Sequence, residues 1–176
     1  MQAKGEPPLT RPGSRPPRRI GILGVSAAVV FGADLATKTW VVSRFGDGHV
    51  THLIPHVLDI QESRNAGAAF GLATGATIMF TLVAAAVAVV IVRESRRLRS
   101  ARWAVALGLL LGGAVGNLGD RLLRSPGPLR GRVVDWIYLH HWPVFNVADS
   151  AIVVGGILCA VLATGGWHLD GSRERR

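Results

Sequence analysis

The stretch Asp135-Trp-Ile-Tyr-Leu-His-His-Trp-Pro-Val-Phe-Asn-Val-Ala-Asp149 guides the interpretation of the whole chain. It begins and ends on a carboxylate, and Asp149 opens a long apolar run that continues through residues 151–167. A charged carboxylate at membrane depth costs roughly 2.5–3.5 kcal/mol, so an acid at the mouth of a hydrophobic helix indicates a function. We expect Asp135 and Asp149 to face one another within hydrogen-bonding range and to share a proton, as catalytic carboxylate pairs do.

The composition indicates a membrane protein with a single domain. The chain has 176 residues, of which 49% are hydrophobic and only 18% charged, and its mean hydropathy is +0.33. A net charge of +9 would suggest nucleic acid in a soluble protein. Here the arginines cluster in short segments between apolar runs, so we expect no nucleic-acid partner. The single cysteine, Cys159, excludes a disulfide framework and a thiolate metal site.

Four apolar runs are long enough to cross a bilayer. They cover residues 20–42, 72–92, 103–118 (extendable through 123) and 147–167. We therefore expect one membrane domain, residues 20–168, between a disordered basic tail, residues 1–19, and a second basic tail, residues 169–176. A cleaved signal peptide is the rival interpretation of the first run, but the apolar character resumes at Trp40.

The connections between the runs predict the topology. Residues 53–60 contain β-branched residues and Pro55, which indicates one or two short strands. The N-terminal tail and the 93–102 turn carry five cations each and the C-terminal tail carries three, against seven elsewhere. The positive-inside rule then predicts that both termini lie in the cytoplasm.

With that topology, the polar residues near the membrane fall at one depth, the outer interface. Helical spacing of three or four residues places the members of each group on one helix face, and four such faces can bury their polar groups away from lipid. The groups are Asp34 and Lys38 in the first run, Asn65 before the second, Asn117, Asp120 and Arg121 at the end of the third, and Asn146 and Asp149 at the start of the fourth.

Each group also has a purely structural interpretation. Asn146 can be the N-cap of the fourth helix, with Asp149 in its first turn. Asp120 and Arg121 can form an interfacial ion pair, and Asp34 and Lys38 can pair along their own helix. The glycines of the third run permit close helix packing and do not match a phosphate-binding motif. These glycines are Gly112, Gly113, Gly116 and Gly119.

Five blocks of sequence, in this order, resemble the bacterial lipoprotein signal peptidase (signal peptidase II) family. Each block is weak alone, but all five in order are specific, and they extend over roughly residues 20–165. The blocks are Asp34-Leu-Ala-Thr-Lys38, Arg64-Asn-Ala-Gly-Ala-Ala-Phe70, Gly116-Asn-Leu-Gly-Asp-Arg121, Val133-Val-Asp135 and Phe145-Asn-Val-Ala-Asp-Ser150.

The resemblance implies an all-α membrane protein with four transmembrane helices and a small β-rich cradle in the first outer connection. It implies an aspartyl endopeptidase that cuts diacylglyceryl-modified prolipoproteins before the lipidated cysteine. Asp135 and Asp149 correspond to its catalytic pair, and no metal or organic cofactor is required. Supporting or substrate-binding positions correspond to Asp34, Lys38, Asn65, Gly67, Asn117, Asp120, Arg121 and Asn146.

The chemistry expected of the pair is general acid and base catalysis, with Arg121 orienting Asp120 or the substrate. The expected partners are prolipoproteins and membrane lipids, the expected state is a monomer, and the site should face outward from the bacterial plasma membrane. Two other functions stay open at this point: a small transporter or proton relay that uses the same acids, and a structural subunit. The 124–131 segment is longer than in many members of the family, and Trp136 follows Asp135 where Phe is usual.

Overall fold

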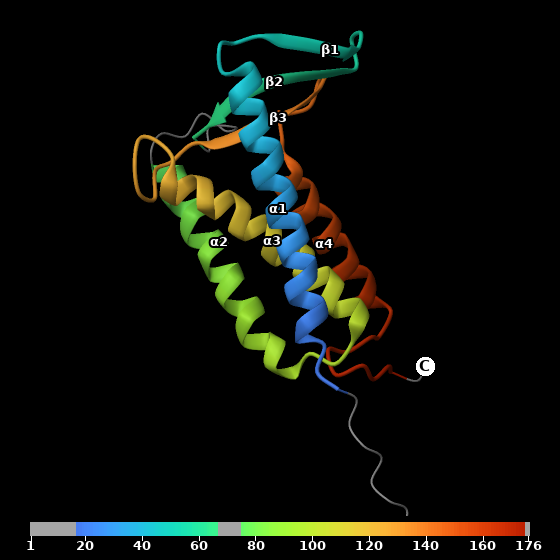
Figure 1. Ribbon diagram of the computed structural model, residues 1–176. Coiled ribbons are helices and arrows are strands. Elements are labelled where there is room, and N and C mark those ends of the chain that lie inside the picture. The colour runs from blue at the N-terminus through green and yellow to red at the C-terminus, as the bar shows by residue number, and fades with distance from the viewer. Residues whose placement is uncertain (1–16, 67–74, 175–176) are drawn as a thin grey trace, which may run out of the picture.

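The computed structural model describes residues 17–66 and 75–174, and the described chain contains four long helices and a three-stranded sheet (Figure 1). A short 3-10 helix, η2 (Ser95–Arg97), follows the second long helix directly. The long helices are α1 (Ile20–Phe45), α2 (Gly75–Glu94), α3 (Ala101–Leu123) and α4 (Val147–Thr164), and the strands are β1 (Val50–Ile54), β2 (Leu58–Asn65) and β3 (Val133–Leu139).

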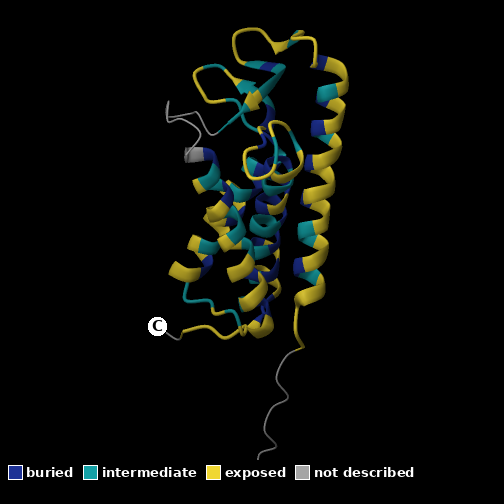
Figure 2. Ribbon diagram, turned by 90° about the vertical axis from the view of Figure 1, so that its left-hand side faces the viewer, coloured by how far each residue is buried: buried dark blue, intermediate teal, exposed yellow. Residues whose placement is uncertain are grey.

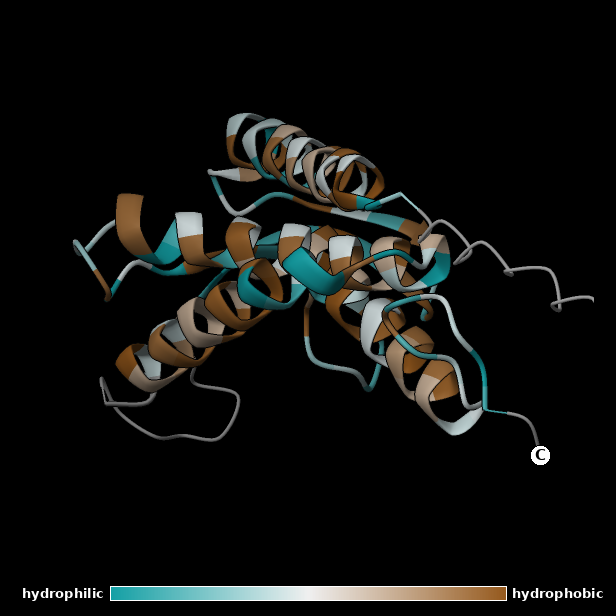
Figure 3. Cartoon of the chain, turned by 90° about the horizontal axis from the view of Figure 1, so that it is seen from below, coloured by the Kyte–Doolittle hydropathy of each residue, from teal (hydrophilic) through white to brown (hydrophobic). Residues whose placement is uncertain are grey.

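All four long helices are apolar enough and long enough to cross a membrane, which confirms the number and order of the predicted spans. Much of the helix surface is exposed and apolar (Figures 2 and 3). The exposed aliphatic side chains include Val25, Val89 and Val161. In a soluble protein such surfaces would be buried, whereas in a bilayer they face lipid.

Helix α3 lies at the centre of the bundle because small residues let its neighbours approach closely. A Cβ atom on Gly112 would lie 2.7 Å from Ala27 O in α1, and one on Gly113 would lie 2.4 Å from Ala148 O in α4. Small residues at such contacts are typical of packed transmembrane helices. The predicted packing role is thus confirmed for Gly112 and Gly113, but it is wrong for Gly119, where a Cβ would meet nothing within 4 Å.

The two described ends of the chain lie at the same end of the bundle, opposite the sheet (Figure 1). Arg19 N donates to Leu98 O at 2.9 Å, and Arg99 N donates to Leu169 O at 2.8 Å. The start of α1, the connection between α2 and α3, and the segment after α4 therefore meet at one place. This arrangement agrees with the even number of spans.

The sheet differs from the expected cradle in its composition. The predicted strand region, 53–60, corresponds to the β1–β2 hairpin, but β3 comes from the second connection and pairs antiparallel with β2. Ser63 is paired with Asp135 and Asn65 with Val133. The sequence predicts strands in the first connection alone, so the expected all-α class with a small β-rich cradle in that connection is incomplete.

The 124–131 segment, which the sequence marks as long, folds back on the end of α3. Gly131 N donates to Arg121 O at 3.0 Å, and the Ser125–Pro126 peptide bond is cis. Leu129 O accepts a hydrogen bond from Thr81 Oγ1 in α2 at 3.2 Å. The segment therefore links α2 to the start of β3, beside the acids.

Candidate active site

The buried side chain of Lys38 forms ion pairs with two carboxylates, one on α1 and one on α3. The Lys38 ammonium lies 2.7 Å from Asp34 Oδ2 on its own helix and 2.9 Å from Asp120 Oδ2 on α3. Asp34 and Lys38 are each 1% exposed and Asp120 is 7% exposed. Buried charges are tolerated when they are paired and hydrogen-bonded, as these three are. The predicted i, i+4 pair of Asp34 and Lys38 is confirmed.

Gly116 is required where α3 passes the ion cluster. A Cβ atom at this position would lie 2.6 Å from Asp34 Oδ2, so any other residue would displace the carboxylate that Lys38 and Ala148 N hold in place. The other oxygen of Asp34 accepts a hydrogen bond from Ala148 N at 3.0 Å. Asp34 thus fixes the first turn of α4 relative to α1.

Asp120 in turn fixes the strand that carries Asp135. Its Oδ2 accepts from Val134 N at 3.2 Å, and its Oδ1 accepts from Arg124 Nε. Because Val134 precedes Asp135 in β3, the position of Asp135 depends on the ion cluster of α1 and α3. Sequence reasoning missed Arg124, although its i, i+4 spacing from Asp120 was a usable signal.

Asn146 connects the two acids of the quoted stretch. Its Nδ2 donates to Asp135 Oδ1 at 2.7 Å, while its Oδ1 accepts from Asp149 N at 2.9 Å. Its own backbone N donates to Asp149 Oδ2 at 3.2 Å, which completes a capping box at the start of α4. The N-cap interpretation is therefore confirmed, and Asn146, which is fully buried, also holds Asp135.

Asn117 links this pair to the ion cluster. Its Oδ1 accepts from Lys38 Nζ at 3.0 Å and from Asn146 Nδ2 at 3.2 Å, and its Nδ2 donates to Asp149 Oδ1 at 2.7 Å. The amide orientation is therefore dictated by a cation on one side and a carboxylate on the other. One network joins α1, α3, α4 and β3.

Asp135 lies in a setting that favours its protonated form. The side chain is 2% exposed, and its Oδ2 accepts from Asn65 Nδ2 at 2.9 Å. Burial first, and then the nearby charge of Asp149, raise the pKa of Asp135 from 3.8 to about 7, although the hydrogen bonds from Asn65 and Asn146 oppose this shift. Near neutral pH this carboxyl exists in both protonation states.

The two carboxylates are joined through Asn146 and not directly. Among residues 17–66 and 75–174 no hydrogen bond links Asp135 to Asp149, and the oxygens of both carboxylates accept from amide N–H groups instead. The expected direct contact is therefore replaced by an asparagine bridge, and Asn65, Asn117 and Asn146 supply the donors.

A cavity of about 250 Å³ opens beside Asp149. Arg121 lines it, is 9% exposed, and has a buried Nη1 with no hydrogen-bond partner among the described residues. Its guanidinium lies 5.8 Å from the ring of Phe80 in α2 and is close enough to Asp135 and Asp149 to interact with their charges. Of the two roles expected for Arg121, an ion pair with Asp120 is wrong, because Asp120 pairs with Lys38 and Arg124, and a contact with the substrate stays a prediction.

Comparison with known proteins gives one consistent result. The model of the family described as Signal peptidase (SPase) II matches residues 26–164. The chain belongs to the signal peptidase II family. It is 47% identical to the lipoprotein signal peptidase of Rhodococcus jostii, over 92% of this chain and 84% of the relative. It is also 47% identical to that of Mycobacterium avium, over 95% and 92%, and 48% identical to that of Streptomyces coelicolor, over 90% and 78%.

The fold is also similar to a solved structure described as a bacterial membrane enzyme. That structure, determined at 1.9 Å resolution, has a TM-score of 0.73 and 30% identity, and the match covers 85% of this chain and 97% of the other. A second structure of the same description, at 2.3 Å resolution, has a TM-score of 0.69 and 30% identity, covering 86% and 92%. The chain is thus a multi-pass bacterial membrane peptidase of the signal peptidase II family.

The structure brings the predicted site residues together, with the exception of Gly67. One connected network contains Asp34, Lys38, Asn65, Asn117, Asp120, Asp135, Asn146 and Asp149, and Arg121 lies beside it. Gly67 lies outside the described residues. The whole 67–74 segment, which follows Ala66, does so as well, so the structure describes the site on the sides of the four long helices and the sheet.

Proposed function

We propose that Asp135 and Asp149 are the catalytic pair of an aspartic-type peptidase that removes the signal peptide from diacylglyceryl-modified prolipoproteins, cutting before the lipidated cysteine. Signal peptide removal from prolipoproteins follows from the family. The observation that carries the proposed mechanism is the bridge of Asn146, which holds Asp135 and Asp149 in one network beside a cavity.

The two carboxyl groups differ in environment, as acid and base roles require. Asp135 is buried and its pKa is raised to about 7, whereas Asp149 is partly exposed and lines the cavity. One proton shared over the pair lets one member deprotonate the attacking water while the other protonates the leaving amide nitrogen. Since the charge of Asp149 acts on Asp135, neither role is assigned to one residue.

Arg121 is suited to bind the substrate backbone. Its buried Nη1 is a charged donor without a partner in the described part of the chain, which is costly unless a ligand accepts the hydrogen bond. A scissile carbonyl oxygen in the cavity beside Asp149 would provide that acceptor, and the charge of Arg121 would stabilise the oxyanion that forms when water attacks. Asn117, already bound to Asp149, would keep that carboxylate oriented.

The cavity also has an apolar side that suits a lipidated residue. Its lining includes Phe80, Val83 and Val87 of α2 and Ile152 of α4, and α2 and α4 expose further aliphatic side chains to lipid. A diacylglyceryl group on the cysteine could remain in the bilayer between these helices while its peptide bond reaches the acids. Membrane depth and acyl chains would together select the substrate.

The distribution of acids disfavours a transporter. A proton relay needs ionisable groups at several depths, whereas Asp34, Asp120, Asp135 and Asp149 belong to one network. That network includes β3, whose sheet lies at one end of the bundle (Figure 1). The comparisons do not support that alternative either. We infer from the positive-inside rule that the end bearing the termini is cytoplasmic and that the acids face outward.

Purified protein incubated with a diacylglyceryl-modified prolipoprotein tests the proposal. Mass spectrometry should find a product that begins with the lipidated cysteine, and the same precursor without the lipid should be cut far more slowly. Asp149→Asn should be inactive while it keeps the thermal stability of a folded protein. Equal cleavage of both precursors would refute the substrate assignment, and an active Asp149→Asn would refute the mechanism.

A further inference from the structure

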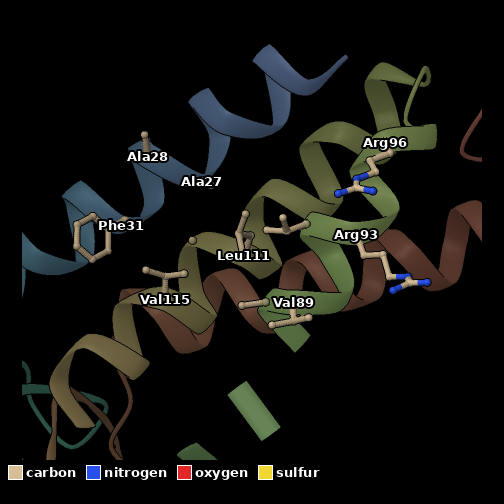
Figure 4. Close-up of a pocket in the computed structure, with 11 residues that line it drawn as sticks. Ala27, Ala28, Phe31, Val89, Arg93, Arg96, Leu111 and Val115 are labelled. Atoms are coloured by element: carbon tan, nitrogen blue, oxygen red, sulfur yellow. The ribbon is translucent and has the colours of Figure 1, made fainter. Parts of the chain in front are cut away.

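A second, larger cavity extends from the middle of α1 and α3, at Phe31 and Val115, to the end of the bundle that bears the termini, and no acid of the network lines it. It has a volume of about 700 Å³ and is formed by α1, α2 and α3. Figure 4 shows Phe31, Val89 and Val115 around it, with Arg93 and Arg96 at one end. The volume falls in the range of small-molecule sites, and the catalytic proposal makes no use of this cavity.

The chemistry of this cavity is divided along its length. Apart from the two arginines, every lining residue is aliphatic, aromatic or glycine. Arg93 lies in the last turn of α2 and Arg96 lies in η2, and both are exposed. Neither forms an ion pair with a carboxylate among residues 17–66 and 75–174. An apolar trough that ends at two such guanidinium groups matches a molecule with hydrocarbon chains and an anionic head.

We propose that this cavity binds one anionic phospholipid, with its acyl chains between α1 and α2 and its phosphate on Arg93 and Arg96. Guanidinium groups bind phosphate oxygens through charge-assisted hydrogen bonds. Basic pockets between transmembrane helices are recognised sites for anionic lipid headgroups. A lipid bound there would hold α1 and α2 against α3 at the end of the bundle opposite the sheet.

Charge argues against the other occupants. A signal peptide has a positively charged N-terminal region, which two arginines at the end of the cavity would repel. A second copy of the chain, placed by two-fold symmetry on the same surface, would bring the Arg93 and Arg96 pairs of both copies together. Topology explains why arginines flank a helix, but it does not explain an apolar cavity that leads up to them.

Native mass spectrometry of the full-length protein, titrated with phosphatidylglycerol or phosphatidylcholine, tests the headgroup contact. The unmodified protein should bind phosphatidylglycerol more tightly. Each arginine near an anionic headgroup contributes roughly five-fold in affinity, so Arg93→Gln with Arg96→Gln should weaken phosphatidylglycerol binding by about 25-fold. The control, Arg18→Gln with Arg97→Gln, removes the same charge from exposed positions at the same end of the bundle and should bind as the unmodified protein does.

A second pair of variants tests the acyl chains. Ala28 lines the cavity and is exposed, so Ala28→Phe should fill it and lower phosphatidylglycerol binding without unfolding the protein. Ala86→Phe places the same ring on an exposed position of α2 outside the cavity and should have no effect. Equal binding by the arginine variant and its control, or by the two phenylalanine variants, would overturn the proposal.

Photocrosslinking identifies the occupant in the membrane. A photoreactive residue at Val89, inside the cavity, should form an adduct with a phospholipid when membranes are irradiated. An adduct with the precursor protein or with a second copy of the chain would assign the cavity to that occupant and overturn the proposal. Proteolysis is not the readout in any of these experiments, so their failure would leave the assignment of Asp135 and Asp149 intact.

Discussion

Replacement of Asp135 by asparagine should make the stability of the protein less dependent on pH. The raised pKa of Asp135, about 7 against 3.8, means that the folded state binds this proton more tightly than the unfolded state. The resulting stabilisation is complete below about pH 4 and is lost as the pH rises through about 7. The interval between the two pKa values corresponds to on the order of 4 kcal/mol. The asparagine side chain would keep an acceptor for the amide of Asn146 and carry no charge.

The assay is thermal unfolding in one detergent and at one scan rate, followed by tryptophan fluorescence at about pH 4 and pH 8. For a chain of this size 1 kcal/mol corresponds to about 2–4 °C. The difference in Tm between Asp135→Asn and the unmodified protein should therefore be roughly 10 °C more favourable to the variant at pH 8 than at pH 4. Asp47→Asn, which removes an exposed carboxylate of the α1–β1 turn, is the matched control and should show no such gain. If Asp135→Asn and Asp47→Asn behave alike, the argument for a proton held at Asp135 is refuted.

Three further substitutions test other parts of the network. Lys38→Met removes the cation from the buried carboxylates of Asp34 and Asp120 and should lower the free energy of unfolding by about 3–5 kcal/mol. Chemical denaturation measures this loss, and an unchanged unfolding midpoint would contradict the prediction. Gly116→Ala forces a Cβ against Asp34 and should lower the free energy of unfolding by about 1–3 kcal/mol. Gly119→Ala, where a Cβ meets nothing within 4 Å, is the control and should be neutral or stabilising. Equal melting temperatures of the two variants would refute the close approach. Arg121→Gln should lower kcat/KM by about 10²–10³-fold with no loss in Tm; a fall in Tm with normal activity per folded molecule would make Arg121 a structural residue instead.

The sequence predicted the helices well because each span has a simple physical requirement. A bilayer needs about 20 apolar residues per helix, and the four runs meet that requirement with little competition from other patterns. The i, i+4 spacing of Asp34 and Lys38 and the N-cap position of Asn146 also follow from local geometry, and the structure has both.

Contacts between distant elements were harder to predict. The sequence offers Arg121 as one possible partner of Asp120, but adjacent residues on a helix point in different directions. Lys38 reaches Asp120 from another helix, and Arg124 reaches it from the next turn. Strand β3 was missed because its pairing with β2 depends on long-range register, which the alternation of its own residues does not reveal.

The most direct measurement of the central claim is the single-turnover rate of cleavage of a diacylglyceryl-modified prolipoprotein, normalised to folded enzyme, for Asp135→Asn, Asp149→Asn and Asp120→Asn. Loss of a group that serves as acid or base should lower the rate by about 10³-fold or more for the first two variants. Asp120, which is bound to Lys38 and Val134 N, positions the strand, so its variant should retain more activity than either. Substantial cleavage by Asp135→Asn together with an inactive Asp120→Asn would contradict the account.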